Sequence, residues 1–375
     1  MHAALPPARL ARRLHALFAV VLVVTTAMPQ ESASMQPAFN PAVTLARLPD
    51  EAYFALDEKT LAPLGRSLVT MLGQQGIAIG APTRIDIAER QALPLLWLRR
   101  STVLRNWQVQ RLRNSMVIVS DLDRGIVNTF YAFTGPKKMD FSQLPRSAEG
   151  ERPDADAAEG ATVSKDVLNV RMLANLAWQP GRLALTVLMH DWVSNTVRVE
   201  LARGTEPAAA VPPFPRAAAA SLDDYYRKQA QLAEPVIRFE RSAATPALAG
   251  PGPALAISVP RSVDAAAARW MAHAAGRVVL TPASLVATDA ADAGGLPTAI
   301  VAVTMIVATL DQTRCAQGIV RVPIRQPGAK VGDLVDFAFD FELKAVLRGS
   351  LPAGTHQIYL ASGEQVAGPF ALKVN

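Results

Sequence analysis

The chain has 375 residues, a formal net charge of +6 and one cysteine. At about 100 to 200 residues per domain, this length favours two domains, each large enough to bury a core without disulfides. The single cysteine, Cys315, excludes an intramolecular disulfide and a lipid-anchored N-terminus, and we expect it to be a buried small apolar residue.

Residues 1–27 are predicted to be an export signal. Three arginines and no acid precede an apolar run that starts at Leu14. This run is roughly 14 residues long, whereas a membrane-spanning helix needs about 20. We therefore expect cleavage after Ala27 or Ala33, with no transmembrane helix afterwards. Loss of the leader lowers the formal charge to +3, and the protein is expected to be periplasmic or secreted.

Composition divides the chain near residue 210. Residues 206–220, EPAAAVPPFPRAAAA, have no apolar periodicity and predict a Pro/Ala linker. We therefore expect an N-terminal β-rich domain over residues 40–205 and a C-terminal domain over residues 221–375. Residues 147–160 hold five acids among alanine, glycine and proline, which predicts an acidic loop inside the first domain.

Alternating apolar residues predict two hairpins in the first domain. One joins Met116–Ser120 to Ile126–Phe133 through a turn in which Gly125 takes a positive φ. The other joins Leu183–Met189 to Val197–Leu201 and has one buried face.

Two stretches of the second domain predict long strands. Thr298–Leu310 is continuously apolar, as is typical of a central strand covered on both sides. In Val335–Leu343 apolar residues occupy every second position, which predicts one buried face. The opposite face, expected to be solvated, carries Asp336, Asp340, Glu342 and Lys344.

Helices are expected to be few and short, at residues 61–72, 221–233 and 264–275. Many strands with regular turns and few helices predict a mainly β protein built from two β-sandwich-like domains.

The C-terminal residues resemble the last two strands of bacterial immunoglobulin-like modules. The resemblance rests on Leu351–Leu360, on Gly363 in the turn and on Val366–Val374. It implies an immunoglobulin-like β-sandwich for the C-terminal domain, a fold that serves adhesion, binding and spacer roles alike.

The strongest local bias is a basic and aromatic stretch without acids between Glu89 and Asp121. Aromatic rings among guanidinium groups can hold anionic polymers, although these arginines can equally pair with the acidic loop. In an exported protein we expect an acidic polysaccharide, an envelope surface or an acidic protein as the partner, and no nucleic acid. The candidate binding residues are Trp97, Arg99, Arg100, Arg105, Trp107 and Arg111.

Residues with catalytic potential are few. His190, Asp191 and Ser194 can in principle supply base, orienting carboxylate and nucleophile. They lie in a predicted hairpin turn, however, in which Asp191 and Asn195 are expected to supply local backbone hydrogen bonds. The acids of Asp336–Glu342 can in principle serve glycoside hydrolysis, although they also fit a solvated sheet face.

No metal or cofactor is expected. The histidines lack zinc-binding spacing, and the only thiol is that of Cys315. Asp121 and Asp123 are spaced like the opening of a calcium loop, but Gly125 stands where another ligand is needed, which favours a tight turn.

The sequence thus predicts an exported, non-enzymatic binding or assembly protein of the cell envelope or secreted fraction. Two alternatives stay open at this point. One is an extracellular hydrolase with a scattered active site, and the other is a periplasmic spacer or chaperone-like protein whose partner pairs with an exposed sheet edge.

Overall fold

The computed structural model describes residues 48–56, 76–101, 115–131, 162–189, 192–205, 209–287, 295–309, 315–349 and 351–375. The chain divides into two units, Met1–Gln36 and Pro37–Asn375, and every element described below belongs to the second. The predicted leader, the helix at 61–72 and the acidic loop at 147–160 lie outside the described residues. Within the described residues, no helix is both long and apolar enough to cross a membrane.

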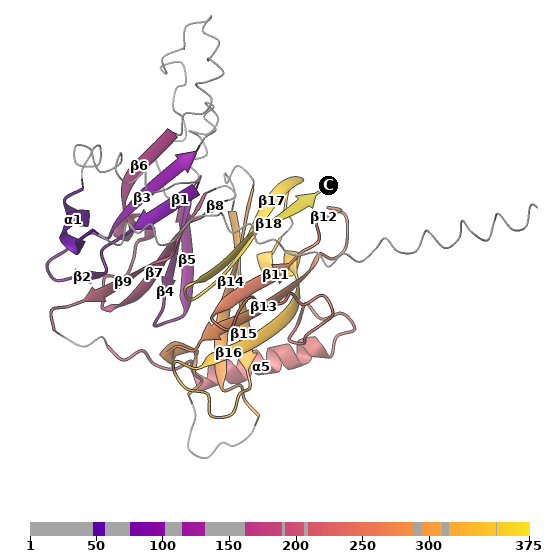
Figure 1. Ribbon diagram of the computed structural model, residues 1–375. Coiled ribbons are helices and arrows are strands. Elements are labelled where there is room, and N and C mark those ends of the chain that lie inside the picture. Colours follow the sequence, from indigo (N-terminus) through magenta and orange to yellow (C-terminus); the bar gives the residue numbers. More distant parts are fainter. Residues whose placement is uncertain are drawn as a thin grey trace, which may run out of the picture. The chain divides into compact units, whose positions relative to one another are not determined.

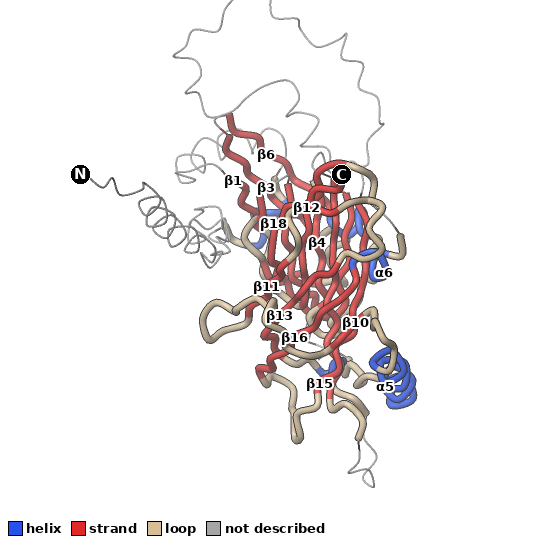
Figure 2. Tube along the Cα trace, turned by 90° about the vertical axis from the view of Figure 1, so that its right-hand side faces the viewer, coloured by secondary structure: helices blue, strands red, loops and turns tan. Residues whose placement is uncertain are grey.

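The protein is mainly β, as predicted, with several sheets and few helices (Figure 1). Figure 2 shows strands running through the middle of the described chain, with the helices α5 and α6 along one side.

Two sheets form the part of the fold that precedes residue 206. Sheet I has the strand order β1-β3-β6, and sheet II has the order β2-β9-β7-β4-β5 with β8 beside β7. The core between them contains Ile79 and Trp97 from sheet I and Val119 and Leu185 from sheet II. The elements are α1 (Asp50–Phe54), β1 (Gly76–Gly80), β2 (Arg84–Asp86), β3 (Pro94–Ser101), β4 (Met116–Asp121), β5 (Ile126–Tyr131), β6 (Thr162–Asn169), α4 (Val170–Ala174), β7 (Gly181–Met189), β8 (Trp192–Val193) and β9 (Val197–Ala202).

Two further sheets form the part that follows residue 209. Sheet III has the order β10-β16-β13-β11, and sheet IV has the order β12-β18-β17-β14-β15. The elements are α5 (Arg216–Ala230), β10 (Ile237–Arg238), β11 (Ala254–Ser258), β12 (Ser262–Val263), β13 (Met271–Val279), η4 (Pro282–Ser284), β14 (Ala299–Thr309), β15 (Cys315–Ile324), β16 (Leu334–Glu342), α6 (Leu343–Leu347), β17 (Gly354–Ser362) and β18 (Gln365–Val374).

An apolar interface joins sheet II to sheet IV. Ile118 of β4 and Leu188 of β7 pack against Ile306 of β14 and Tyr359 of β17, and all four are buried. The side chain of Thr129 also donates a hydrogen bond to that of Gln317 across this interface, at 2.8 Å. The two halves therefore share a continuous core in addition to their separate ones.

This interface corrects one prediction and explains another. The hairpins at 116–131 and 183–201 form as predicted, and Gly125 has a φ of +65°. However, β7 is buried on both faces instead of one, because sheet I covers one face and sheet IV the other. The same packing covers both faces of β14, which is the central strand predicted at 298–310.

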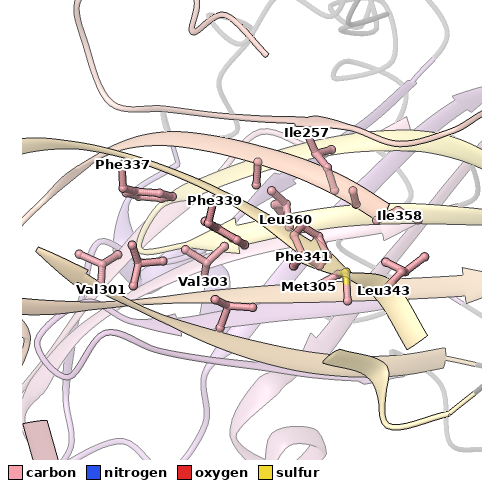
Figure 3. Packing of buried hydrophobic residues seen from close by; sticks show 14 of the residues in the cluster. Ile257, Val301, Val303, Met305, Phe337, Phe339, Phe341, Leu343, Ile358 and Leu360 are labelled. Carbon is pink, nitrogen blue, oxygen red and sulfur yellow. The ribbon is translucent and has the colours of Figure 1, made fainter. Parts of the chain in front are cut away.

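The alternation predicted in Val335–Leu343 is present in β16. Phe337, Phe339 and Phe341 are buried and face sheet IV. Figure 3 shows them along the row formed by Val301, Val303 and Met305 of β14. The ring centroids of Phe339 and Phe341 lie 5.3 Å apart, as in the tilted contacts that aromatic pairs prefer.

The opposite face of β16 is only in part the solvated acidic face that was predicted, because Asp336 is exposed while Asp340 and Glu342 are buried. Asp340 contacts His273 of β13 and Ser242, and Glu342 accepts from the Trp270 N–H next to β13. Asp340 lies 2.7 Å from His273 Nδ1, directly opposite in the register, and Asp336 pairs with Arg277 in the same way. The Lys344 ammonium donates to the carbonyl oxygens of Ala265 and Ala267 instead of extending the row.

The helix predicted at 264–275 is wrong, since a turn is followed there by strand β13. Its small residues face aromatic rings: Ala272 and Ala274 stand opposite Phe341 and Phe339. A Cβ on Gly276 would lie 2.2 Å from the Phe337 ring. Cross-strand packing therefore outweighs the helix propensity of the alanines.

The predicted helix at 221–233 exists but begins earlier, at Arg216, and ends at Ala230. It therefore takes in the last residues of the expected linker, including the fully buried Ala219. The division of the chain into two domains near residue 210 stays a prediction. Cys315, expected to be buried, is exposed, because it begins the edge strand β15.

Candidate functional site: an apolar cavity with arginines

A cavity of about 690 Å³ lies where the two halves of the fold meet. This volume is in the range of small-molecule sites, about 300–1,000 Å³. Its walls come from distant parts of the chain: the β4–β5 turn, a proline-rich segment, the end of β13 with η4, the start of β14 and the β17–β18 turn. It is therefore a property of the assembled fold.

The proline-rich segment 211–215 forms one wall of the cavity. Proline fixes φ and keeps this segment extended. The Phe214 N–H donates to the Leu285 carbonyl oxygen at 2.6 Å, and the Ala287 N–H donates to the Phe214 carbonyl oxygen at 3.0 Å. Phe214 also packs against Val286 and Ile300. Residues expected to be a linker thus hold a fixed position beside the cavity.

Three aliphatic side chains that line the cavity are left about half exposed. Ile126 is 47% exposed, Val279 48% and Val331 53%. Leu334, 40% exposed, stands opposite Val279 in the β13–β16 register and extends this surface. Covering a half-exposed aliphatic side chain contributes about 1 kcal/mol, so this surface favours an apolar ligand.

The lining also contains four arginines and one glutamate. Arg124 donates to Asp121 at 2.7 Å, and Arg182 donates to Asp123 at 2.6 Å. Arg198 pairs with Glu364 of the β17–β18 turn at 2.5 Å. Three of the four guanidinium groups are thus neutralised by carboxylates of their own chain.

Arg321 of β15 is different. Among the described residues, no carboxylate lies within ion-pair distance of its guanidinium group. Its backbone is held on both sides, since β15 pairs with β14 at Ala302 and a hydrogen bond joins the Arg321 backbone to the Tyr226 hydroxyl of α5. The cavity therefore presents one fixed residue with an uncompensated positive charge.

Burial raises the pKa of Tyr226 to about 12, and burial beside Asp50 raises the pKa of Tyr53 to about 12 as well. Because folding favours the neutral phenol, each of these tyrosines contributes about 2 kcal/mol to the free energy of unfolding below pH 10. This contribution is lost between pH 10 and 12. We expect the free energy of unfolding to fall over this interval. Absorbance titration at 295 nm should show at least two tyrosines that ionise well above pH 10, and Tyr226→Phe should remove one of them. Ionisation of all tyrosines near pH 10 would contradict this.

Of the predicted binding residues, Trp97 lies fully buried in the core between sheets I and II. Its ring is thus packed inside the protein and does not stand on a surface. Arg99 and Arg100 follow it in β3, but their side chains lie outside the described residues, as do Arg105, Trp107 and Arg111 entirely. Binding at these arginines and at Trp107 stays a prediction.

The predicted catalytic candidates are placed only in part. His190 and Asp191 lie outside the described residues. Ser194 is buried, and its hydroxyl accepts from the Val187 N–H at 2.8 Å while it donates to the Asn195 carbonyl oxygen at 2.7 Å. The hydroxyl is therefore occupied by backbone groups. Asn195, expected to bond locally, instead pairs with the Ile79 backbone of β1, accepting from its N–H and donating to its carbonyl oxygen, both at 2.9 Å.

A second serine, histidine and aspartate group occurs on sheet III. Ser242 Oγ lies 3.4 Å from His273 Nδ1, and Asp340 Oδ1 lies 2.7 Å from the same nitrogen. A catalytic triad needs the nucleophile and the carboxylate at opposite ring nitrogens, so this geometry does not activate Ser242. These hydrogen bonds instead hold the loop at Ser242 against β13 and β16.

The residues proposed as the opening of a calcium loop form a tight turn. Asp121 Oδ1 accepts from the N–H groups of Asp123 and Arg124, and Asp123 binds the Arg182 guanidinium group. Within the part of the chain that the structure describes, no group of three or more His, Cys, Asp or Glu residues is placed to hold a metal.

Comparison with known proteins does not assign the chain to a family. No family model matches the chain, and no curated protein matches it. Among solved structures, red sea bream transglutaminase is similar over 83% of this chain and 33% of its own length, at 7% identity and a TM-score of 0.17. The chain thus spans about a third of that protein, and a score this low carries no argument about fold or activity.

Sequence reasoning did not find the cavity. Its arginines are scattered from residue 124 to residue 321, and the acids that pair with three of them lie at the end of β4 and in two turns. One signal was available, because Phe214 is a large apolar residue among three prolines, which a solvated linker has no reason to contain.

Proposed function

We propose that this protein is exported and acts as a non-enzymatic binding protein, with the cavity between its two halves as the ligand site. The cavity carries the proposal: exposed aliphatic walls, a wall fixed by proline and a set of arginines converge there from distant segments. Such a combination of apolar surface and few polar groups is typical of ligand sites. The basic residues and the leader support an anionic ligand in the periplasm or the secreted fraction.

We further propose that the C-terminal half is an immunoglobulin-like module. The strand order β12-β18-β17-β14-β15 facing β11-β13-β16 supports this, because the last hairpin lies beside the central strand β14. In immunoglobulin-like sandwiches the final hairpin packs in this way against a strand from the middle of the chain.

A chaperone-like role through pairing on β15 is less well supported. α6 approaches this edge so closely that a Cβ on Gly318 would lie 2.5 Å from the Val346 carbonyl oxygen, and Tyr226 bonds to the backbone at Arg321. Helices that cover an edge strand oppose the addition of another strand.

The proposed site is testable with 1-anilinonaphthalene-8-sulfonate, an apolar anion whose fluorescence rises on apolar surfaces. We expect saturable binding by the native protein. Val279→Glu, which places a carboxylate at the cavity, should weaken binding at least tenfold through repulsion and lost apolar contact. Ile319→Glu is the matched control, because Ile319 is 47% exposed in a strand and does not line the cavity.

Equal binding by Val279→Glu and Ile319→Glu, with both variants folded by circular dichroism, would contradict the proposed site. Turnover of an ester, peptide or glycan substrate that disappears in His190→Ala would contradict the non-enzymatic role. N-terminal sequencing of the exported protein is expected to show cleavage after Ala27 or Ala33.

A further inference from the structure

Serine hydroxyl groups of the cavity lining already form hydrogen bonds within the protein. Ser284 Oγ accepts from the Thr281 N–H and donates to the Thr281 carbonyl oxygen, both at 2.7 Å. Ser362 Oγ donates to the Ala302 carbonyl oxygen at 2.9 Å. A ligand therefore finds few hydrogen-bonding side chains that it can use without breaking an existing bond.

Most of the arginines in the lining likewise already form ion pairs within the protein. Asp121, Asp123 and Glu364 neutralise Arg124, Arg182 and Arg198, so these three pairs add no net charge. A highly charged polymer would have to compete with these carboxylates for each arginine. Only Arg321, among the described residues of the lining, offers a guanidinium group without a carboxylate, and the excess charge is therefore one.

We propose that the ligand is an amphipathic monoanion, with one carboxylate bound by Arg321 and an aliphatic body lying along Ile126, Val279 and Val331. This inference rests on the proposed function of the cavity. A guanidinium group donates two parallel hydrogen bonds to a carboxylate, a fit that an ammonium group does not offer. The half-exposed aliphatic side chains supply the surface that the body of the ligand would cover.

Calorimetric titration of the full protein with decanoate tests the proposal. Arg321→Gln should weaken decanoate binding about 10- to 100-fold, the effect of losing a charge-assisted hydrogen-bonded pair. The native protein should bind octanoate about 15-fold more weakly than decanoate, because each methylene group contributes about a fourfold factor. Decanol should bind the native protein about as weakly as decanoate binds Arg321→Gln.

The matched control is Arg203→Gln. It removes one positive charge from an exposed arginine that does not line the cavity. We expect its affinity for decanoate to change less than threefold. Thermal unfolding confirms that each variant is folded before titration.

The outcomes separate this inference from the proposed function. Equal decanoate binding by native protein and Arg321→Gln would overturn the inference while the cavity remains a ligand site. Displacement of the naphthalene sulfonate by polyglutamate and not by decanoate would also overturn it, in favour of an acidic peptide. If neither anion binds and Val279→Glu has no effect on the naphthalene sulfonate, both proposals fail.

Discussion

Glu342→Ala is expected to lower the free energy of unfolding by about 2–4 kcal/mol, because three backbone donors, of which that of Trp270 is buried, lose their acceptor. The Glu342 carboxylate accepts from the N–H groups of Trp270 at 3.0 Å, Lys344 at 3.1 Å and Ala345 at 2.6 Å. It is only 6% exposed, so water does not readily replace it. One side chain thus caps α6 and fixes the chain that enters β13.

Urea denaturation followed by circular dichroism measures this loss. Glu342→Gln keeps one carbonyl oxygen and should lose about half as much stability. The matched control is Asp336→Ala on the same strand face, whose partly exposed pair with Arg277 contributes less than about 1 kcal/mol. Equal losses for Glu342→Ala and Asp336→Ala would show that the acidic face is solvated after all.

Trp97→Ala is expected to cost about 3–5 kcal/mol of stability, the usual range for removing a large buried aromatic ring. Trp97 is fully buried in the same core cluster as Val119 and Leu185. The milder Trp97→Phe should lose less stability and should bind the naphthalene sulfonate as the native protein does.

Denaturation and binding titrations of both Trp97 variants distinguish a core residue from a ligand contact. A stability loss below 1 kcal/mol in Trp97→Ala, together with lost binding, would place the ring at a binding surface. The opposite pattern, lower stability with unchanged affinity, is the one that the fold predicts.

Local sequence patterns predicted those parts of the fold that depend on neighbours in the chain. The alternation in Val335–Leu343 was enough to predict strand β16 and its row of buried phenylalanines. The continuous apolar run of Thr298–Leu310 predicted the central strand β14. In both cases the periodicity of one segment reports which of its faces are buried.

Features that depend on distant partners were missed. Asp340 and Glu342 are buried because His273 and the Trp270 backbone, 67 and 72 residues away in the sequence, reach them. The alanines of β13 suggested a helix because the phenylalanines opposite them belong to β16, about 65 residues later. Propensity is a local quantity and carries no information about such partners.

The cavity illustrates the same limit for function. The basic and aromatic stretch between Glu89 and Asp121 was conspicuous because its residues are adjacent in sequence. Arg321 was not conspicuous in the sequence. It differs from the other cavity arginines because each of them pairs with a carboxylate, whereas Arg321 has no carboxylate partner among the described residues. Counting charges along the chain cannot distinguish paired from uncompensated arginines.

A crystal structure of the protein with decanoate tests the central claim most directly. We expect density for one ligand in the cavity, with its carboxylate within hydrogen-bond distance of the Arg321 guanidinium group and its chain along Val279 and Val331. Decanoate bound elsewhere, or a cavity that holds only water at saturating decanoate, would contradict the claim.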